Sequence, residues 1–123
     1  MQQRVTVPVQ IASGTALSAE VNINAGRIIG IQMPAGWDAA GLSIQALLRQ
    51  PAGNPPAPVF GEVIDNAGAE LVLAAAPAAN EYVALQDTLP LKALGRVKVR
   101  SGTAALPVNQ TATRDFFLVI LVD

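Results

Sequence analysis

The sequence predicts an all-β protein, a single antiparallel β-sandwich (Ig-like or jelly-roll) of about nine short strands with at most one or two single-turn helices. Three observations carry this prediction. Apolar and polar residues alternate with a period of two along most of the chain, turn-forming residues recur roughly every 8–15 positions, and no long stretch has the period of a helix. This pattern favours two antiparallel sheets packed face to face.

The first three strands are expected before residue 34. Residues 5–11 alternate strictly, and Pro8 has no amide hydrogen to donate, so this strand is predicted to lie at a sheet edge. Residues 21–24 and 27–33 flank the pair Ala25-Gly26, which suits a tight turn. We therefore expect these two strands to form a hairpin.

A break in the strand pattern follows at residues 34–41. Asp38 is a candidate N-cap for one helical turn that ends at Gly41. Trp37, in the same break, is expected to close one end of the sandwich; contact with a ligand is the alternative. The strand pattern then resumes at residues 42–48.

The second half of the chain repeats this alternation of strands and turns. The last strand carries a continuous apolar run, residues 116–122, which is typical of a strand buried on both faces. The expected elements are strands over residues 59–64, 69–74, 81–86, 96–100 and 114–122, and a helical turn over 89–94 capped by Thr88.

One domain is expected to span residues 1–123, because this length is near the commonest domain size and suffices to bury a core without disulfides. Nothing in the sequence marks a second domain or an internal repeat. The residues expected in the core are Val7, Ile23, Ile31, Ile44, Leu73, Val83, Val97, Val99 and Val119.

Composition argues against several classes of function. The chain has no cysteine and no histidine, which removes disulfides, thiolate zinc sites and the usual general base. Its nine acidic residues are scattered, and the few aromatic residues do not suggest a sugar-binding cleft. Asp65-Asn66 and Glu70 do not reproduce a calcium-loop spacing. We therefore expect no catalytic site, no cofactor and no metal.

The charge and hydropathy of the chain also bear on its partners. A net charge of −1 would not attract nucleic acid. No apolar leader opens the sequence, and the run at 116–122 is far shorter than the roughly 20 residues that span a bilayer. We expect neither a nucleic-acid nor a membrane partner.

The fraction of residues that are charged is more informative than the net charge. Only 14% of the residues are charged and 51% are hydrophobic, whereas roughly 25% are charged in an ordinary soluble protein. One interpretation is that other subunits cover part of the surface, which predicts a homo-oligomer, with a trimer favoured. The alternative is that abundant Ala and Gly raise the apolar count without making patches.

Two segments are candidates for partner binding. Arg96, Lys98 and Arg100 share one face of a strand while Val97 and Val99 point inward. This basic stripe either docks on acidic groups of a partner or is a solvated face that guards against edge pairing. The second candidate is the Pro-rich loop over residues 51–58, which is either an arm that lies on a neighbour or a passive connection; its prolines are Pro51, Pro55, Pro56 and Pro58.

Three segments resemble a known group of proteins. They are residues 33–46 (MPAGWDAAGLSIQA), 89–103 (LPLKALGRVKVRSGT) and 107–110 (PVNQ). Their order resembles small β-rich proteins encoded among the structural genes of tailed bacteriophages and prophages. In those proteins a P-x-G-W-x-A-A-x-L-x-F/I-Q strand precedes a K-V-R-S-G-T strand and a P-V-x-Q loop. The Pro-rich loop at 51–58 departs from the resemblance, because related sequences more often have a polar segment there.

The resemblance implies a non-enzymatic virion protein. We expect a capsid decoration (cement) protein made in the bacterial host cytoplasm, placed on the capsid surface of the virion and bound across major capsid subunits. A tail or head–tail component of the same particle is the alternative. A carbohydrate- or receptor-binding module is an alternative from a different class, and it would need an aromatic platform.

Overall fold

The computed structural model describes residues 2–24, 26–48, 59–85 and 95–122. Each of the nine expected strands is present, and the described residues contain no helix. The strands are β1 (Gln3–Ile11), β2 (Val21–Asn24), β3 (Arg27–Gln32), β4 (Leu42–Leu47), β5 (Phe60–Glu62), β6 (Val72–Ala74), β7 (Tyr82–Ala84), β8 (Gly95–Ser101) and β9 (Arg114–Val122).

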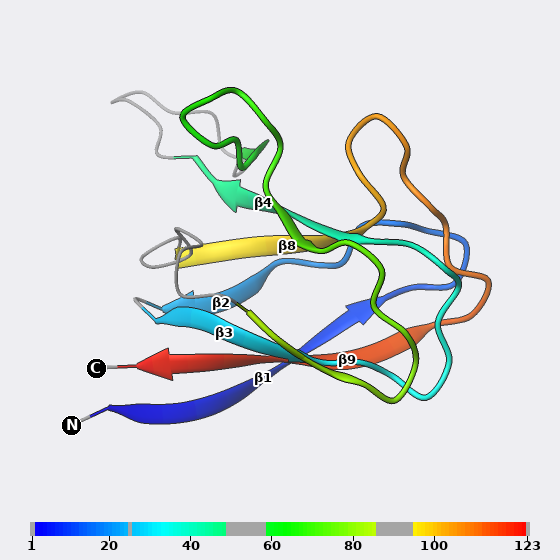
Figure 1. Cartoon of the computed structure of the whole chain (residues 1–123), viewed down its shortest axis with the longest axis horizontal. Helices are drawn as coiled ribbons and strands as arrows, with labels where there is room; N and C mark the ends of the chain where they lie inside the picture. The colour runs from blue at the N-terminus through cyan, green and yellow to red at the C-terminus, as the bar shows by residue number, and fades with distance from the viewer. Residues whose placement is uncertain (1, 25, 49–58, 86–94, 123) are drawn as a thin grey trace.

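The strands form two antiparallel sheets that pack as a β-sandwich, which confirms the predicted fold class (Figure 1). Sheet A has the order β1-β9-β3-β7, and sheet B has the order β2-β8-β4-β5 with β6 also paired to β4. The long strand β1 pairs along its whole length with β9, from Gln3 opposite Val122 to Ile11 opposite Arg114. The strand that contains Pro8 therefore lies at an edge, as expected.

The hairpin expected at residues 21–33 is wrong. Strand β2 pairs with β8 in sheet B, whereas β3 pairs with β9 and β7 in sheet A. The connection therefore crosses from one sheet to the other, and the amide of Gly26 donates to the carbonyl of Ile23 at 3.0 Å. A side chain at Gly26 would collide with Ile120 of β9, so the crossing requires a glycine where the chain passes close to the core.

The helical turn expected at residues 38–41 is also wrong. This segment has no helical hydrogen bonds, and Asp38 binds groups far along the chain instead of capping a helix. Trp37 packs edge-on against Phe116, with ring centroids 5.9 Å apart, and donates from Nε1 to the carbonyl of Ala40. It therefore lies against the core, as expected. The second expected turn, over 89–94 with Thr88, lies outside the described residues.

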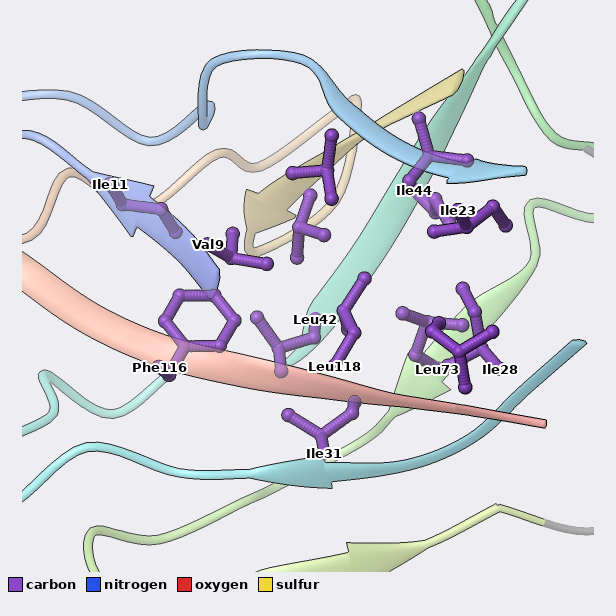
Figure 2. Packing of buried hydrophobic residues seen from close by; sticks show 14 of the residues in the cluster. Val9, Ile11, Ile23, Ile28, Ile31, Leu42, Ile44, Leu73, Phe116 and Leu118 are labelled. Atoms are coloured by element: carbon purple, nitrogen blue, oxygen red, sulfur yellow. The ribbon is translucent and has the colours of Figure 1, made fainter. Parts of the chain in front are cut away.

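The core lies between the two sheets, and both contribute to it. In Figure 2, Phe116 and Leu118 of β9 point into the same space as Val9 of β1 and Leu42 of β4. Of the residues expected in the core, Val7 and Val83 are only partly buried at its margin. The buried cluster comprises Val9, Ile11, Val21, Ile23, Ile28, Ile31, Met33, Leu42, Ile44, Leu71, Leu73, Val97, Val99, Phe116, Leu118 and Ile120.

Strand β9 differs from expectation in the direction of its side chains. Phe116, Leu118 and Ile120 face the core, so Val119 faces outward although its neighbours cover it. Phe117 also faces outward and is 41% exposed. The middle of the run, residues 118–120, is therefore buried on both faces as expected, whereas Phe117 leaves an apolar side chain on the outer face of sheet A.

Candidate interaction surfaces

Strand β8 carries the predicted basic stripe across the outer face of sheet B. Val97 and Val99 are fully buried in the core, so Arg96, Lys98 and Arg100 face away from it, as the alternation requires. The three cations nevertheless have different surroundings. Two of them are accessible, and the third is enclosed.

Arg100 is the enclosed cation. Its side chain is only 7% exposed, and its guanidinium forms ion pairs with Glu62 of β5 and Glu70. Nη1 donates to Glu62 Oε2 at 2.9 Å, Nη2 lies 2.5 Å from Glu70 Oε2, and Nε donates to the hydroxyl of Ser43 at 3.1 Å. Gln45 completes the cluster by donating to Glu62 at 2.7 Å. The structure thus gives Arg100 an internal role, which differs from the solvated or docking position expected for it.

The contacts within this cluster shift the pKa values of Glu62 and Arg100 in opposite directions. Hydrogen bonds from Arg100 hold the pKa of the Glu62 carboxyl below its ordinary value, against a smaller opposing effect of burial. The same contacts raise the pKa of Arg100. Both groups therefore remain charged at neutral pH.

Arg96 and Lys98 are the accessible cations of the stripe. Arg96 lies 3.6 Å from Glu20, and both side chains are about half exposed, so the pair contributes little to stability. The ammonium group of Lys98 lies 4.7 Å from the centroid of the Phe60 ring, a cation–π contact. These contacts orient the two side chains and leave their charges in reach of a partner.

A second polar cluster, which the sequence interpretation missed, surrounds Gln110. Its side chain is fully buried. The amide nitrogen donates to Ser101 Oγ at 2.7 Å and to the carbonyl of Asp38 at 3.2 Å. The amide oxygen accepts from the backbone of Asp38 at 2.9 Å and from Arg114 Nε at 3.1 Å. Backbone bonds to Gly14 and Thr15 satisfy the remaining groups of this residue.

Asp38 extends this network to the surface. Its carboxylate accepts from the backbone amide of Thr111 at 2.8 Å, from the Thr111 hydroxyl at 3.1 Å and from Arg114 Nη2 at 3.0 Å. The bond from the Thr111 amide is the main reason that the pKa of Asp38 is lowered. The Asp38 carboxylate therefore joins the break at 34–41 to the connection before β9.

The remaining site predictions concern residues that these clusters do not include. Pro51, Pro55, Pro56 and Pro58 lie outside the described residues, and so does the whole segment 89–94. Within the described ranges, no three acidic side chains gather into a group that would hold a metal ion. The same ranges contain no helix long and apolar enough to cross a membrane.

Comparison of the chain with protein-family models, curated proteins and solved structures gives no match. The resemblance to phage proteins therefore depends on the three motif segments alone. The structure brings those segments together: Asp38 belongs to the first, Ser101 to the second and Gln110 to the third. No signal in the sequence predicted the burial of Gln110, because a glutamine in a loop is ordinarily exposed.

Proposed function

We propose that this chain is a non-enzymatic structural protein of a tailed-phage particle, a capsid decoration protein that binds across neighbouring major capsid subunits and stabilises the shell. The observation that carries the proposal is the junction at Gln110, where all three resembling segments meet. Ser101 and Gln110 occupy fixed positions of their motifs, and Gln110 binds the first segment through the backbone amide and carbonyl of Asp38, a variable position of its motif. The occurrence of these motifs in phage proteins is therefore understandable as a shared fold.

Decoration of a shell depends on the area of each protein interface and on the number of copies bound, and it requires no catalytic group. A standard protein interface buries about 1,600 Å² in total, and many copies on a symmetric lattice reinforce a modest contact by avidity. A small sandwich whose polar clusters fix its loops suits this task, because rigid surfaces lose little entropy on binding. Its location would be the capsid surface, after synthesis in the bacterial cytoplasm.

The outer face of sheet B is the surface that we assign to the shell. Arg96 and Lys98 project from it, held by Glu20 and the Phe60 ring. Beneath them Arg100 ties β8 to Glu62 and Glu70, which fixes the spacing of strands β8, β4 and β5. An acidic capsid surface would complement the two accessible cations.

Labelling of intact particles tests the proposal. Antibodies against the chain would be applied to particles released from the bacterium that carries its gene, and gold label would be located by electron microscopy. Label on heads, including heads without tails, supports a decoration protein. Label on tails or at the head–tail junction supports the alternative virion component. Protein that stays in the cleared lysate while particles remain unlabelled would overturn both.

The same particles offer a functional control. Shells assembled without the gene should carry no label and should disrupt at a lower temperature than decorated shells. Addition of the purified protein should restore the label and the higher temperature. Equal heat resistance with and without bound protein would contradict the stabilising role.

A further inference from the structure

The outer face of sheet A has a regular arrangement of side chains. The registers of β1, β9, β3 and β7 place outward-facing residues in four rows across the strands. From one end of the sheet to the other, the rows are Arg4, Leu121 and Arg27; Thr6, Val119, Gly30 and Ala84; Pro8, Phe117, Gln32 and Tyr82; and Gln10 and Asp115.

The two middle rows form an uncharged patch. Phe117 is 41% exposed and Tyr82 is 49% exposed, and Pro8 stands beside Phe117 on the edge strand. The Tyr82 side chain lies across Gly30, which has no side chain to displace it. The outer face of sheet B, in contrast, carries the ion pairs of Arg100 with Glu62 and Glu70 and two accessible cations. The two faces of the sandwich are therefore chemically different.

The end rows of sheet A carry opposite charges. Arg4 and Arg27 occupy the first row, and Asp115 occupies the last, where Gln10 donates to its carboxylate at 2.8 Å. Arg4 and Gln10 are six positions apart along β1, which is about 20 Å at roughly 3.3 Å per residue. The face is thus cationic at one end, apolar in the middle and anionic at the other end.

We propose that a second copy of the chain packs on this face, related by a two-fold axis that lies across the strands. This axis reverses the strand direction, so the Arg4 end of each copy meets the Asp115 end of the other. An axis along the strands would instead place the cationic end row of one copy against the same row of the other. The proposed axis also sets the third row of one copy against the second row of the other.

The area of the face determines how strongly the copies associate. Three strand spacings of about 4.8 Å and a length of about 20 Å give a footprint of roughly 300 Å². A standard interface buries about 800 Å² per partner, so the pair is expected to be reversible and concentration-dependent. Such a face-to-face contact closes at two copies, in contrast to the trimer expected from the composition. The inference is independent of the capsid proposal.

Exchange of the charges at positions 4 and 115 tests the direction of the two-fold axis. Sedimentation of the full chain from about 10 µM to about 1 mM should show monomers converting to dimers. Arg4→Asp or Asp115→Arg should each weaken dimerisation about tenfold, because each brings like charges together. The double variant Arg4→Asp/Asp115→Arg should restore it. Monomer throughout the range, a trimer, or failure of the double variant to recover would overturn the proposal.

Crosslinking provides a second test, because the chain has no native cysteine. In the double variant Arg4→Cys/Gln10→Cys, the proposed axis brings position 4 of one copy opposite position 10 of the other. A bismaleimide that reaches about 10 Å, the spacing of packed sheets, should then give a covalent dimer. The single variant Arg4→Cys should give none, since its two thiols lie at opposite ends. Efficient crosslinking of the single variant would overturn the axis. Unchanged thermal unfolding of each variant would verify its fold.

Discussion

The side-chain amide of Gln110 donates a 2.7 Å hydrogen bond to the hydroxyl of Ser101, and neither side chain is exposed to solvent. This bond joins the end of β8 to the connection that leads into β9. Through Asp38, the same glutamine also holds the segment between β3 and β4. One side chain therefore links the end of β8 and two connections at one end of the sandwich.

Replacement of Gln110 by Ala should destabilise the protein by about 3 kcal/mol, because buried partners of its amide lose their hydrogen bonds. The free energy of unfolding in urea measures this effect. Asn109→Ala is the matched control, since Asn109 is exposed and such a change is usually within about 0.5 kcal/mol. Equal losses in the two variants would contradict a structural role specific to Gln110.

Gly102, in the K-V-R-S-G-T motif, should tolerate no side chain. Its φ is +92°, and an added Cβ would meet the carbonyl oxygen of Leu106 and lie 2.9 Å from the amide nitrogen of Val108. Gly102→Ala should therefore cost about 3 kcal/mol or more, from backbone strain together with a backbone collision. Thermal and urea unfolding would measure it.

Gly14 offers a control that separates these two causes. Its φ is +80°, but an added Cβ would find no atom within 4 Å. Gly14→Ala should cost only the conformational strain of about 1–2 kcal/mol. If Gly102→Ala is no worse than Gly14→Ala, then the turn after β8 adapts more easily than its geometry indicates.

The strands could be predicted from the sequence because each depends on local alternation. The edge position of β1 could also be predicted, since a missing amide hydrogen at Pro8 is a property of one residue. Sheet membership could not. The pair at 25–26 has the composition of a tight turn, yet the chain crosses there from sheet B to sheet A. Turn composition does not distinguish a hairpin from such a crossing.

The candidate site could likewise be predicted only as far as local alternation determines it. A period of two placed Arg96, Lys98 and Arg100 on one face, and the structure has them there. Their different exposure depends on Glu62 and Glu70, which reach Arg100 from distant positions in the chain. Alternation along β8 contains no information about those partners. The outward direction of Phe117 was missed because a continuous apolar run does not reveal which residues face the core.

Arg100→Gln should destabilise the protein at pH 7 by about 2–3 kcal/mol. Breaking a fully buried ion pair typically costs about 3–5 kcal/mol. The cost is expected to be smaller here because the carboxylates of Glu62 and Glu70 are partly exposed. In the native protein, Arg100 lowers the pKa of Glu62, so the ionised carboxylate of Glu62 stabilises the folded state. This contribution to stability is present above the ordinary carboxyl pKa of about 4.3. It is lost as the pH falls through the lowered pKa of the folded protein. In the variant, protonation instead relieves repulsion between the two carboxyls.

The difference in stability between the native protein and Arg100→Gln should therefore shrink when the pH is lowered from 7 to about 3. Urea unfolding at both pH values measures it, with Arg96→Gln as the control on the same strand. Arg96→Gln should change stability by less than about 0.5 kcal/mol at either pH. A difference for Arg100→Gln that is independent of pH would show that the lost packing of the arginine, and not its charge, is responsible.

Arg96 and Lys98 should contribute to docking on the shell, where Arg100 does not. The double variant Arg96→Gln/Lys98→Gln retains the buried cluster, so its stability should remain close to that of the native protein. Its binding to undecorated shells should be weaker, and more so at low salt than at high salt, because exposed charge pairs are screened beyond about 10 Å at 0.1 M ionic strength. Cosedimentation of the protein with shells at several salt concentrations measures the effect. The variant Asn109→Ala, at an exposed position outside both proposed surfaces, keeps these cations and serves as the control. If the double variant occupies shells as fully as the native protein at every salt concentration, the two cations of β8 are merely solvated and another surface must bind the shell.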